Sequence, residues 1–111
     1  MRELRMITAQ REAIEDLCRR FRVERLEVFG SATRADFDEK TSNIDLIVDF
    51  QDEGAEGLFD RYWALTEELE RLLARPVELL TERMIRNPYF RAAVNKERQP
   101  IYARESEEAV R

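Results

Sequence analysis

The chain has 111 residues, which is enough for one domain and too few for two domains of ordinary size. Hydrophobic residues make up 43% of it, so a packed core is available and a disordered chain is disfavoured. The net charge is −5 and the basic residues are scattered. A general nucleic-acid-binding protein would need a basic stripe, so we expect no nucleic-acid partner.

Cysteine content and apolar runs bear on the cellular compartment. Cys18 is the single cysteine, so no disulfide can form within the chain, and its apolar neighbours predict a small buried residue. The first residues lack the apolar segment of a signal peptide. No run approaches the roughly 18–20 apolar residues that span a membrane. We therefore expect a reduced, cytoplasmic protein that does not bind membranes.

The first third of the chain predicts a helix followed by a strand. From residue 4 to about 21, apolar residues recur at helical spacing between charged ones: Leu4, Ile7, Ile14, Leu17, Cys18 and Phe21. Residues 25–29 alternate between apolar and polar side chains, which favours a short strand ending at Gly30-Ser31. Residues 32–42 are polar and typical of turns.

Residues 43–50 form the clearest predicted strand. Because side chains alternate along a strand, one face is apolar and consists of Ile44, Leu46, Val48 and Phe50. The other face consists of Asn43, Asp45, Ile47 and Asp49. This second face therefore has carboxylates next to an apolar residue.

The remaining elements complete a small sheet domain. Residues 58–73 predict a long amphipathic helix that ends before Pro76, and residues 77–81 predict a further strand. A last helix is expected near Pro88, followed by Ile101-Tyr102 docking against the body. The predicted order is helix, strand, strand, helix, strand, helix. This order indicates a small α/β or α+β domain with a mixed sheet and helices on one side.

Three local features predict a site for phosphate and metal. Gly30-Ser31 ends a strand, where backbone N–H groups and a hydroxyl can approach a phosphate. Asn43 and Asp45 are two residues apart on one strand and so point the same way, about 6.5–7 Å apart. Glu78 lies within a neighbouring predicted strand. Oxygen ligands at this spacing can hold divalent cations, with the third carboxylate completing the site.

These features together resemble the nucleotidyltransferase signature. The run Gly-Ser-Ala-Thr-Arg at 30–34 is followed, after eleven residues between Ser31 and Asn43, by Asn-Ile-Asp-Leu-Ile-Val. The signature is Gly-Ser, a spacer of similar length, and Asp-x-Asp on a strand. The small size and the Asn-Pro-Tyr-Phe run at 87–90 resemble the minimal nucleotidyltransferases, the MNT family. The resemblance covers roughly residues 5–104, and we expect a domain over 1–104 with a flexible C-terminal tail over 105–111.

The resemblance implies a role for each matching residue. Gly30 and Ser31 would hold the nucleoside triphosphate, with Arg34 steadying its phosphates. Asn43, Asp45 and Glu78 would occupy the metal positions, and Asp45 and Glu78 would be the catalytic carboxylates. The implied reaction is transfer of AMP from ATP with Mg²⁺ as cofactor and release of pyrophosphate.

Two residues depart from the family pattern. Asn43 stands where the first metal-binding aspartate belongs, so one of three expected negative charges is lost. Glu78 is one methylene longer than the usual aspartate, which is a milder change. Asp49 lies on the same strand face but too far along to replace the missing carboxylate.

Each assignment also has a structural alternative. Gly30-Ser31 could form an ordinary turn, and Glu78 and Arg34 could simply face solvent. Asp45 is harder to explain in this way, because a carboxylate inside an apolar strand needs a partner. We expect Tyr62 and Trp63 to fill the core or an interface rather than to stack on a base.

Three functions remain open at this point. The resemblance implies an antitoxin that attaches AMP to a hydroxyl of its partner, a HEPN-type ribonuclease toxin. The second hypothesis is a catalytically impaired protein of the same fold that neutralises its toxin by binding. The third is a nucleotide sensor that binds ATP without turnover. Self-association is compatible with each of them.

Overall fold

The computed structural model describes residues 7, 9–29, 43–51 and 56–104. Within this part of the chain the elements follow in the order α2, β1, β2, α3, β3, η2, α4 and β4. Gly30, Ser31 and Arg34 lie outside the described residues, as does the predicted tail 105–111. None of the described helices combines the length and the apolar character needed to cross a bilayer.

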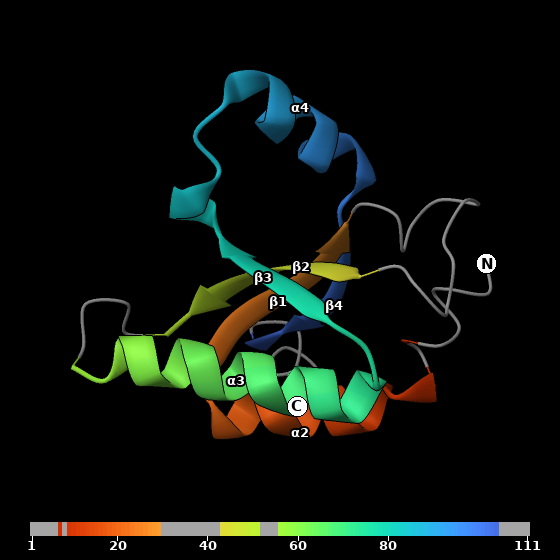
Figure 1. Ribbon diagram of the computed structural model, residues 1–111, viewed down its shortest axis with the longest axis vertical. Coiled ribbons are helices and arrows are strands. Elements are labelled where there is room, and N and C mark those ends of the chain that lie inside the picture. The colour runs from red at the N-terminus through yellow and green to blue at the C-terminus, as the bar shows by residue number, and fades with distance from the viewer. Residues whose placement is uncertain (1–6, 8, 30–42, 52–55, 105–111) are drawn as a thin grey trace.

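Four strands form one mixed sheet in the order β3-β2-β1-β4 (Figure 1). The central strand β1 (Val23–Phe29) pairs antiparallel with both β2 (Ile44–Phe50) and β4 (Gln99–Ala103). The edge strand β3 (Val77–Thr81) runs parallel to β2. A parallel pair needs a crossover connection, and the helix between β2 and β3 provides it. The mixed sheet predicted from the sequence is therefore confirmed.

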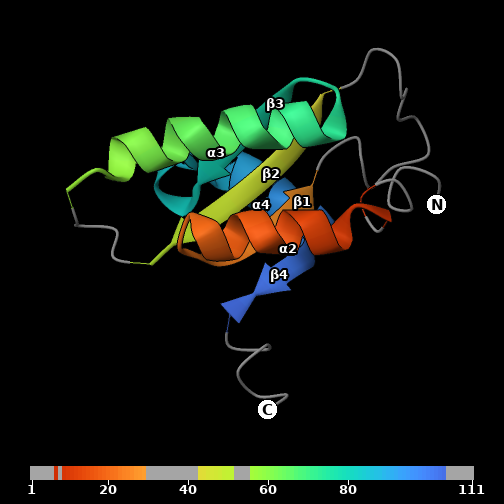
Figure 2. The same cartoon turned by 90° about the horizontal axis from the view of Figure 1, so that it is seen from below.

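Two helices cover one face of the sheet (Figure 2). They are α2 (Arg11–Arg20) and α3 (Leu58–Leu73), and the bounds of α3 are those predicted from its leucine spacing. Each helix is followed closely by a non-glycine residue in the left-handed region, Arg22 with φ 59° and Ala74 with φ 57°. The Ala74 N–H donates to the carbonyl of Glu70, so the chain leaves α3 through a left-handed cap just before Pro76.

The main core fills the space between these helices and the sheet. Its members are apolar residues of α2, α3 and the inward face of all four strands, among them Ile14, Cys18, Leu26, Leu46, Leu65, Leu69, Leu79 and Tyr102. Cys18 is fully buried, which confirms the prediction of a small core residue. The apolar alternation of β2 is confirmed in the same way, because Ile44, Leu46 and Val48 all belong to this core.

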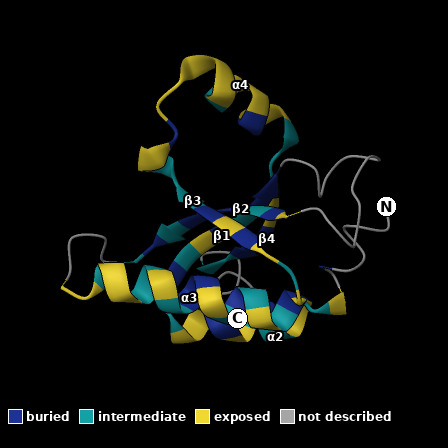
Figure 3. Ribbon diagram, viewed as in Figure 1, coloured by how far each residue is buried: buried dark blue, intermediate teal, exposed yellow. Residues whose placement is uncertain are grey.

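The last helix, α4 (Pro88–Glu97), packs on the opposite face of the sheet, which differs from the expected one-sided arrangement (Figures 1 and 3). Asn87 caps it by accepting hydrogen bonds from the N–H groups of Tyr89 and Phe90, and Pro88 occupies the first turn. Val94 is its one buried residue. A second small cluster of Phe29, Ile47, Ile85 and Val94, with Leu80 beside it, joins this helix to the sheet. Apolar residues of the strands on the face opposite α2 and α3 therefore pack against α4 and hold it there.

The segment predicted to dock at Ile101-Tyr102 is a fourth strand, β4. It pairs with β1 along the free edge of the sheet, with Leu26 opposite Tyr102 and Glu27 opposite Pro100. Only Ile101 and Tyr102 of this strand are buried, and a proline is tolerated because the strand lies at an edge. A pattern with only two apolar residues is too short to predict a strand, so β4 was absent from the predicted order of elements.

Candidate active site

Asp45 and Glu78 lie opposite each other on neighbouring parallel strands. The register of β2 and β3 pairs Ile44 with Val77, Asp45 with Glu78 and Leu46 with Leu79. Neighbouring strands are about 4.8 Å apart, so the backbones of the two acidic residues are adjacent. The structure therefore brings together the two carboxylates that the sequence placed on separate strands.

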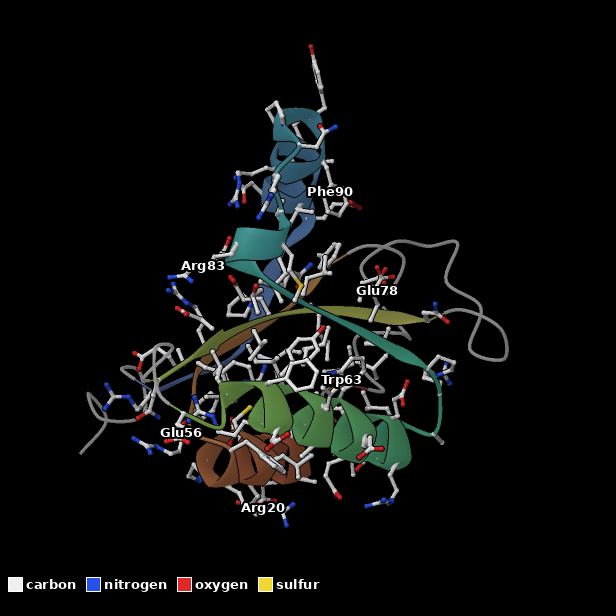
Figure 4. The ribbon with its side chains drawn as sticks, turned by 60° about the vertical axis from the view of Figure 1, so that its left-hand side comes forward. Arg20, Glu56, Trp63, Glu78, Arg83 and Phe90 are labelled. Carbon is white, nitrogen blue, oxygen red and sulfur yellow. The ribbon has the colours of Figure 1, made fainter. Side chains whose placement is uncertain are left out.

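Both carboxylates lie on the sheet face opposite α2 and α3. The residues flanking them, Ile44, Leu46, Val77 and Leu79, belong to the main core between the sheet and those helices. Because successive side chains of a strand alternate between faces, Asp45 and Glu78 point to the other side. Asp45 is half-buried and Glu78 is exposed, with Glu78 on the upper side of β3 in Figure 4. This combination leaves the acidic pair accessible to a ligand while the strands that carry it are anchored in the core.

Asn43 directly precedes β2 and is exposed. The N–H of the next residue, Ile44, donates to the carbonyl of Pro76 at 3.0 Å. This bond ties the start of β2 to the start of β3 and helps to set the register that pairs Asp45 with Glu78. The segment containing Asn43 is therefore held at the same end of the sheet as the acidic pair.

An apolar surface borders the acidic pair on the side of β1. Phe29 is the register partner of Asp45 on β1, and it packs edge-to-face against Phe90 of α4 with ring centroids 6.1 Å apart. Ile47 and Leu80, on the same sheet face, belong to the same small cluster as Phe29. One side of the acidic pair is consequently formed by packed hydrocarbon, which lowers the local dielectric and strengthens charge interactions there.

Asp49, the other carboxylate on this face of β2, belongs to a different interaction. It is the register partner of Arg25 on β1, and its Oδ2 atom accepts a hydrogen bond from Arg25 Nη2 at 3.3 Å. Asp49 is therefore engaged in a cross-strand ion pair. This arrangement agrees with the prediction that it does not replace the carboxylate missing at Asn43.

Tyr62 of α3 lies at the edge of β3 close to the acidic pair. Its hydroxyl donates a hydrogen bond to the carbonyl of Leu79. Burial raises the pKa of Tyr62, and the negative charge of Glu78 raises it further. The side chain packs against the main core, which confirms the expectation that Tyr62 is a packing residue.

A network of ion pairs holds α4 and the preceding turn to the site face. The 3₁₀ turn η2 (Glu82–Met84) follows β3, and Arg98 follows α4. The guanidinium of Arg98 donates to the carboxylates of Glu27 on β1 and Glu82 on η2, with 3.1 Å from Nε to Glu27 Oε1. Arg91 of α4 donates to Glu82 as well, at 3.0 Å. Hydrogen bonding from Arg98 and Arg91 lowers the pKa of Glu82 against the opposing effect of its partial burial.

Sequence reasoning missed this network. Glu27 and Arg98 are far apart in sequence, and single charges at such separations carry no periodic signal. One signal was available in the sequence: Glu27 alternates with apolar residues in β1. A charged side chain on a strand that is covered by other elements requires a partner.

The acidic pair is a suitable but incomplete donor set for divalent cations. Among the described residues, no three histidine, cysteine or acidic side chains converge to hold a metal. Two carboxylate oxygens and the amide oxygen of Asn43 are nevertheless ligands of the kind that Mg²⁺ accepts, because Mg²⁺ keeps several waters and needs few protein ligands. The phosphate-binding candidates Gly30, Ser31 and Arg34 lie outside the described residues, so their predicted role stays a prediction.

Comparison with known proteins identifies the family. The family model described as "Nucleotidyltransferase domain" matches residues 10–101. The chain belongs to the nucleotidyltransferase family. A candidate protein adenylyltransferase of Methanocaldococcus jannaschii is 35% identical over 78 residues, covering 70% of this chain and 76% of that protein. This nucleotidyltransferase domain is thus similar to a relative whose name specifies transfer to proteins.

Solved structures agree with the family and with the fold. A structure described as a minimal nucleotidyltransferase superposes with a TM-score of 0.70 and 33% identity, covering 87% of this chain and 94% of that chain. The MNT antitoxin complex with a tri-AMPylated HEPN toxin of Shewanella oneidensis superposes with a TM-score of 0.57 over 94% of this chain and 78% of that chain. Its identity is only 17%, so this second likeness shows the fold alone. The expected nucleotidyltransferase fold is confirmed.

Proposed function

We propose that this nucleotidyltransferase domain transfers AMP from ATP to a hydroxyl of a partner protein, and that it acts as the antitoxin of a HEPN-type toxin in the cytoplasm. The observation that carries the proposal is the register pairing of Asp45 with Glu78 on the sheet face opposite α2 and α3. The resemblance to a candidate protein adenylyltransferase supports a protein as the acceptor. The toxin–antitoxin complexes among the structural neighbours support the kind of partner.

Each site residue has a chemical task in this proposal. Asp45 and Glu78, with the amide oxygen of Asn43, would hold Mg²⁺, which when bound supplies positive charge to the triphosphate and the leaving group. Glu78, the more exposed carboxylate, would orient the acceptor hydroxyl or accept its proton. Gly30 and Ser31 would bind the phosphates, and Arg34 would steady them. The hydroxyl oxygen forms a bond to the α-phosphorus while the bond to the β-phosphate oxygen breaks, so pyrophosphate leaves.

A second candidate function follows from Asn43. A neutral amide in place of a carboxylate weakens the attraction of the site for Mg²⁺. In that case the protein would neutralise the toxin by binding it, and AMP transfer would be slow or absent. The two candidates differ in one measurable quantity, the AMP found on the partner.

The test uses the full chain, Mg²⁺, ATP labelled in the α-phosphate, and the purified protein encoded by the adjacent gene. We expect label on that protein, and we expect Asp45→Ala to abolish it. Asp49→Asn is the matched control, because Asp49 lies on the same strand face but is paired with Arg25. Complex formation without label would contradict the transferase and support neutralisation by binding.

A further inference from the structure

A groove with four aromatic side chains among its eight lining residues lies at the end of the sheet away from Asn43. It is formed between the first half of α3 and the segment where β3 passes into η2, and its volume is about 410 Å³. We call it the aromatic groove, and its lining residues are Phe50, Leu58, Phe59, Tyr62, Trp63, Thr81, Arg83 and Met84. The predicted site residues Asn43, Asp45 and Glu78 are not among them.

The walls of the aromatic groove expose unusually large apolar side chains. Phe59 is 73% exposed, Trp63 is 51% exposed and Met84 is 51% exposed. Trp63 makes edge-to-face contacts with Phe59 at 6.1 Å and with Tyr62 at 5.4 Å between ring centroids. Because Tyr62 is itself held by the hydrogen bond to Leu79, the rings are organised in advance of any ligand. Exposed aromatic and methionine side chains grouped in a concave patch are typical of protein-binding surfaces.

The groove also carries a positive charge that the described residues do not neutralise. Arg83 of η2 lines it and is exposed, and among the described residues no carboxylate forms an ion pair with it. The adjacent carboxylate, Glu82, is engaged by Arg91 and Arg98. An occupant with apolar side chains and a carboxylate would therefore complement both the aromatic wall and Arg83.

We propose that the aromatic groove docks a partner protein through a short segment that carries apolar side chains and at least one carboxylate. The partner is the acceptor protein of the proposed function, so its identity rests on that function. Figure 4 shows Trp63 between α3 and β3, with Arg83 and Glu78 at different ends of the β3–η2 segment. Docking at the groove would hold the partner on the protein while the Asp45–Glu78 face stays accessible to its hydroxyl.

Binding measurements with the purified protein of the adjacent gene test the proposal. We expect Trp63→Ala to weaken binding by about thirtyfold or more, as is typical of an aromatic anchor. Tyr89→Ala is the matched control, because Tyr89 is an aromatic residue of α4, outside the groove, that is 87% exposed. Circular dichroism and thermal unfolding establish that both variants are folded. Equal binding by wild type and Trp63→Ala, or a loss confined to Tyr89→Ala, would overturn the proposal.

Charge reversal tests the second half of the proposal independently of packing. Arg83→Glu is expected to weaken binding at least tenfold at low salt, whereas Arg86→Glu, an exposed arginine outside the groove lining, is expected to have little effect. Similar losses for both variants would show a general charge effect and would overturn the requirement for a carboxylate opposite Arg83.

The outcome for docking is separable from the outcome for transfer. Asp45→Ala is expected to retain binding and lose AMP transfer, whereas Trp63→Ala is expected to lose binding. Failure of the transfer assay with groove-dependent binding intact would contradict only the transferase. If the wild type does not bind the partner but forms a dimer that Trp63→Ala dissociates in sedimentation, the groove is an interface between copies and the proposal fails.

Discussion

Asp45 and Glu78 are register partners on parallel strands that a helical crossover separates in sequence. The pairing depends on backbone bonds that reach across the start of both strands, including the one from Ile44 N–H to the Pro76 carbonyl. Two carboxylates held side by side repel each other unless a cation lies between them. This geometry leads to predictions for both the neighbouring amide and the carboxylates themselves.

Replacing the amide at the start of β2 should improve the metal site. We expect Asn43→Asp to raise the affinity for Mn²⁺ or Mg²⁺ at least about tenfold, because a third carboxylate joins Asp45 and Glu78. Isothermal titration calorimetry with the metal alone measures this. An unchanged affinity in a folded Asn43→Asp variant would show that the position does not face the metal.

The length of the acidic side chain on β3 should matter less than its charge. We expect Glu78→Gln to lower the rate of AMP transfer by roughly tenfold or more, since it removes the negative charge of a metal ligand and the carboxylate that orients the acceptor hydroxyl or accepts its proton. Glu78→Asp should retain much of the rate, because the family pattern usually has aspartate here. Rates at saturating ATP compare the two variants, and a larger loss in Glu78→Asp than in Glu78→Gln would indicate that side-chain length rather than charge is decisive.

Removing the guanidinium of Arg98, which joins β1 to η2, should destabilise the folded protein. Arg98 and Glu27 have side chains that are only 18% and 15% exposed, so Arg98→Met would leave the Glu27 carboxylate partly buried without this partner. We expect a loss of roughly 2–4 kcal/mol in the free energy of unfolding. Urea denaturation measures it, with Arg19→Met as a control, because Arg19 pairs with Asp16 on the exposed side of a single helix, α2.

Glu82, which accepts hydrogen bonds from two arginines, should make the free energy of unfolding depend on pH. The hydrogen bonds from Arg98 and Arg91 lower the pKa of Glu82 below its ordinary value of 4.5. Ionised Glu82 therefore stabilises the folded state above that pH, and the contribution is lost as the pH falls through the lower folded value.

The matched variant for this pH effect is Glu82→Gln. The difference in unfolding free energy between wild type and Glu82→Gln should be largest near neutral pH and shrink as the pH falls below about 4.5. Denaturation curves at several pH values give this difference directly. A difference that stays constant down to strongly acidic pH would mean that hydrogen-bond geometry, and not the charge of Glu82, supplies the stabilisation.

Local patterns were enough to locate most elements of the fold. The leucine spacing before Pro76 predicted α3 with its observed bounds, and the short apolar run after it predicted β3. These signals are readable because helix and strand periodicities act over a few neighbouring residues. The fourth strand was not predicted, because a strand with two buried residues is defined by its pairing with β1 rather than by its own pattern.

The sequence by itself determined that Asn43 and Asp45 flank the apolar residue Ile44 at the start of a strand, and that a carboxylate, Glu78, stands in the next strand of the chain. Only the tertiary structure decided that Asp45 and Glu78 face each other, because strand order and register come from pairing between distant segments. The same holds for Arg98 with Glu27 and for the grouping of Trp63, Arg83 and Met84 in one groove. Such contacts arise from the packing of whole elements, which no local spacing encodes.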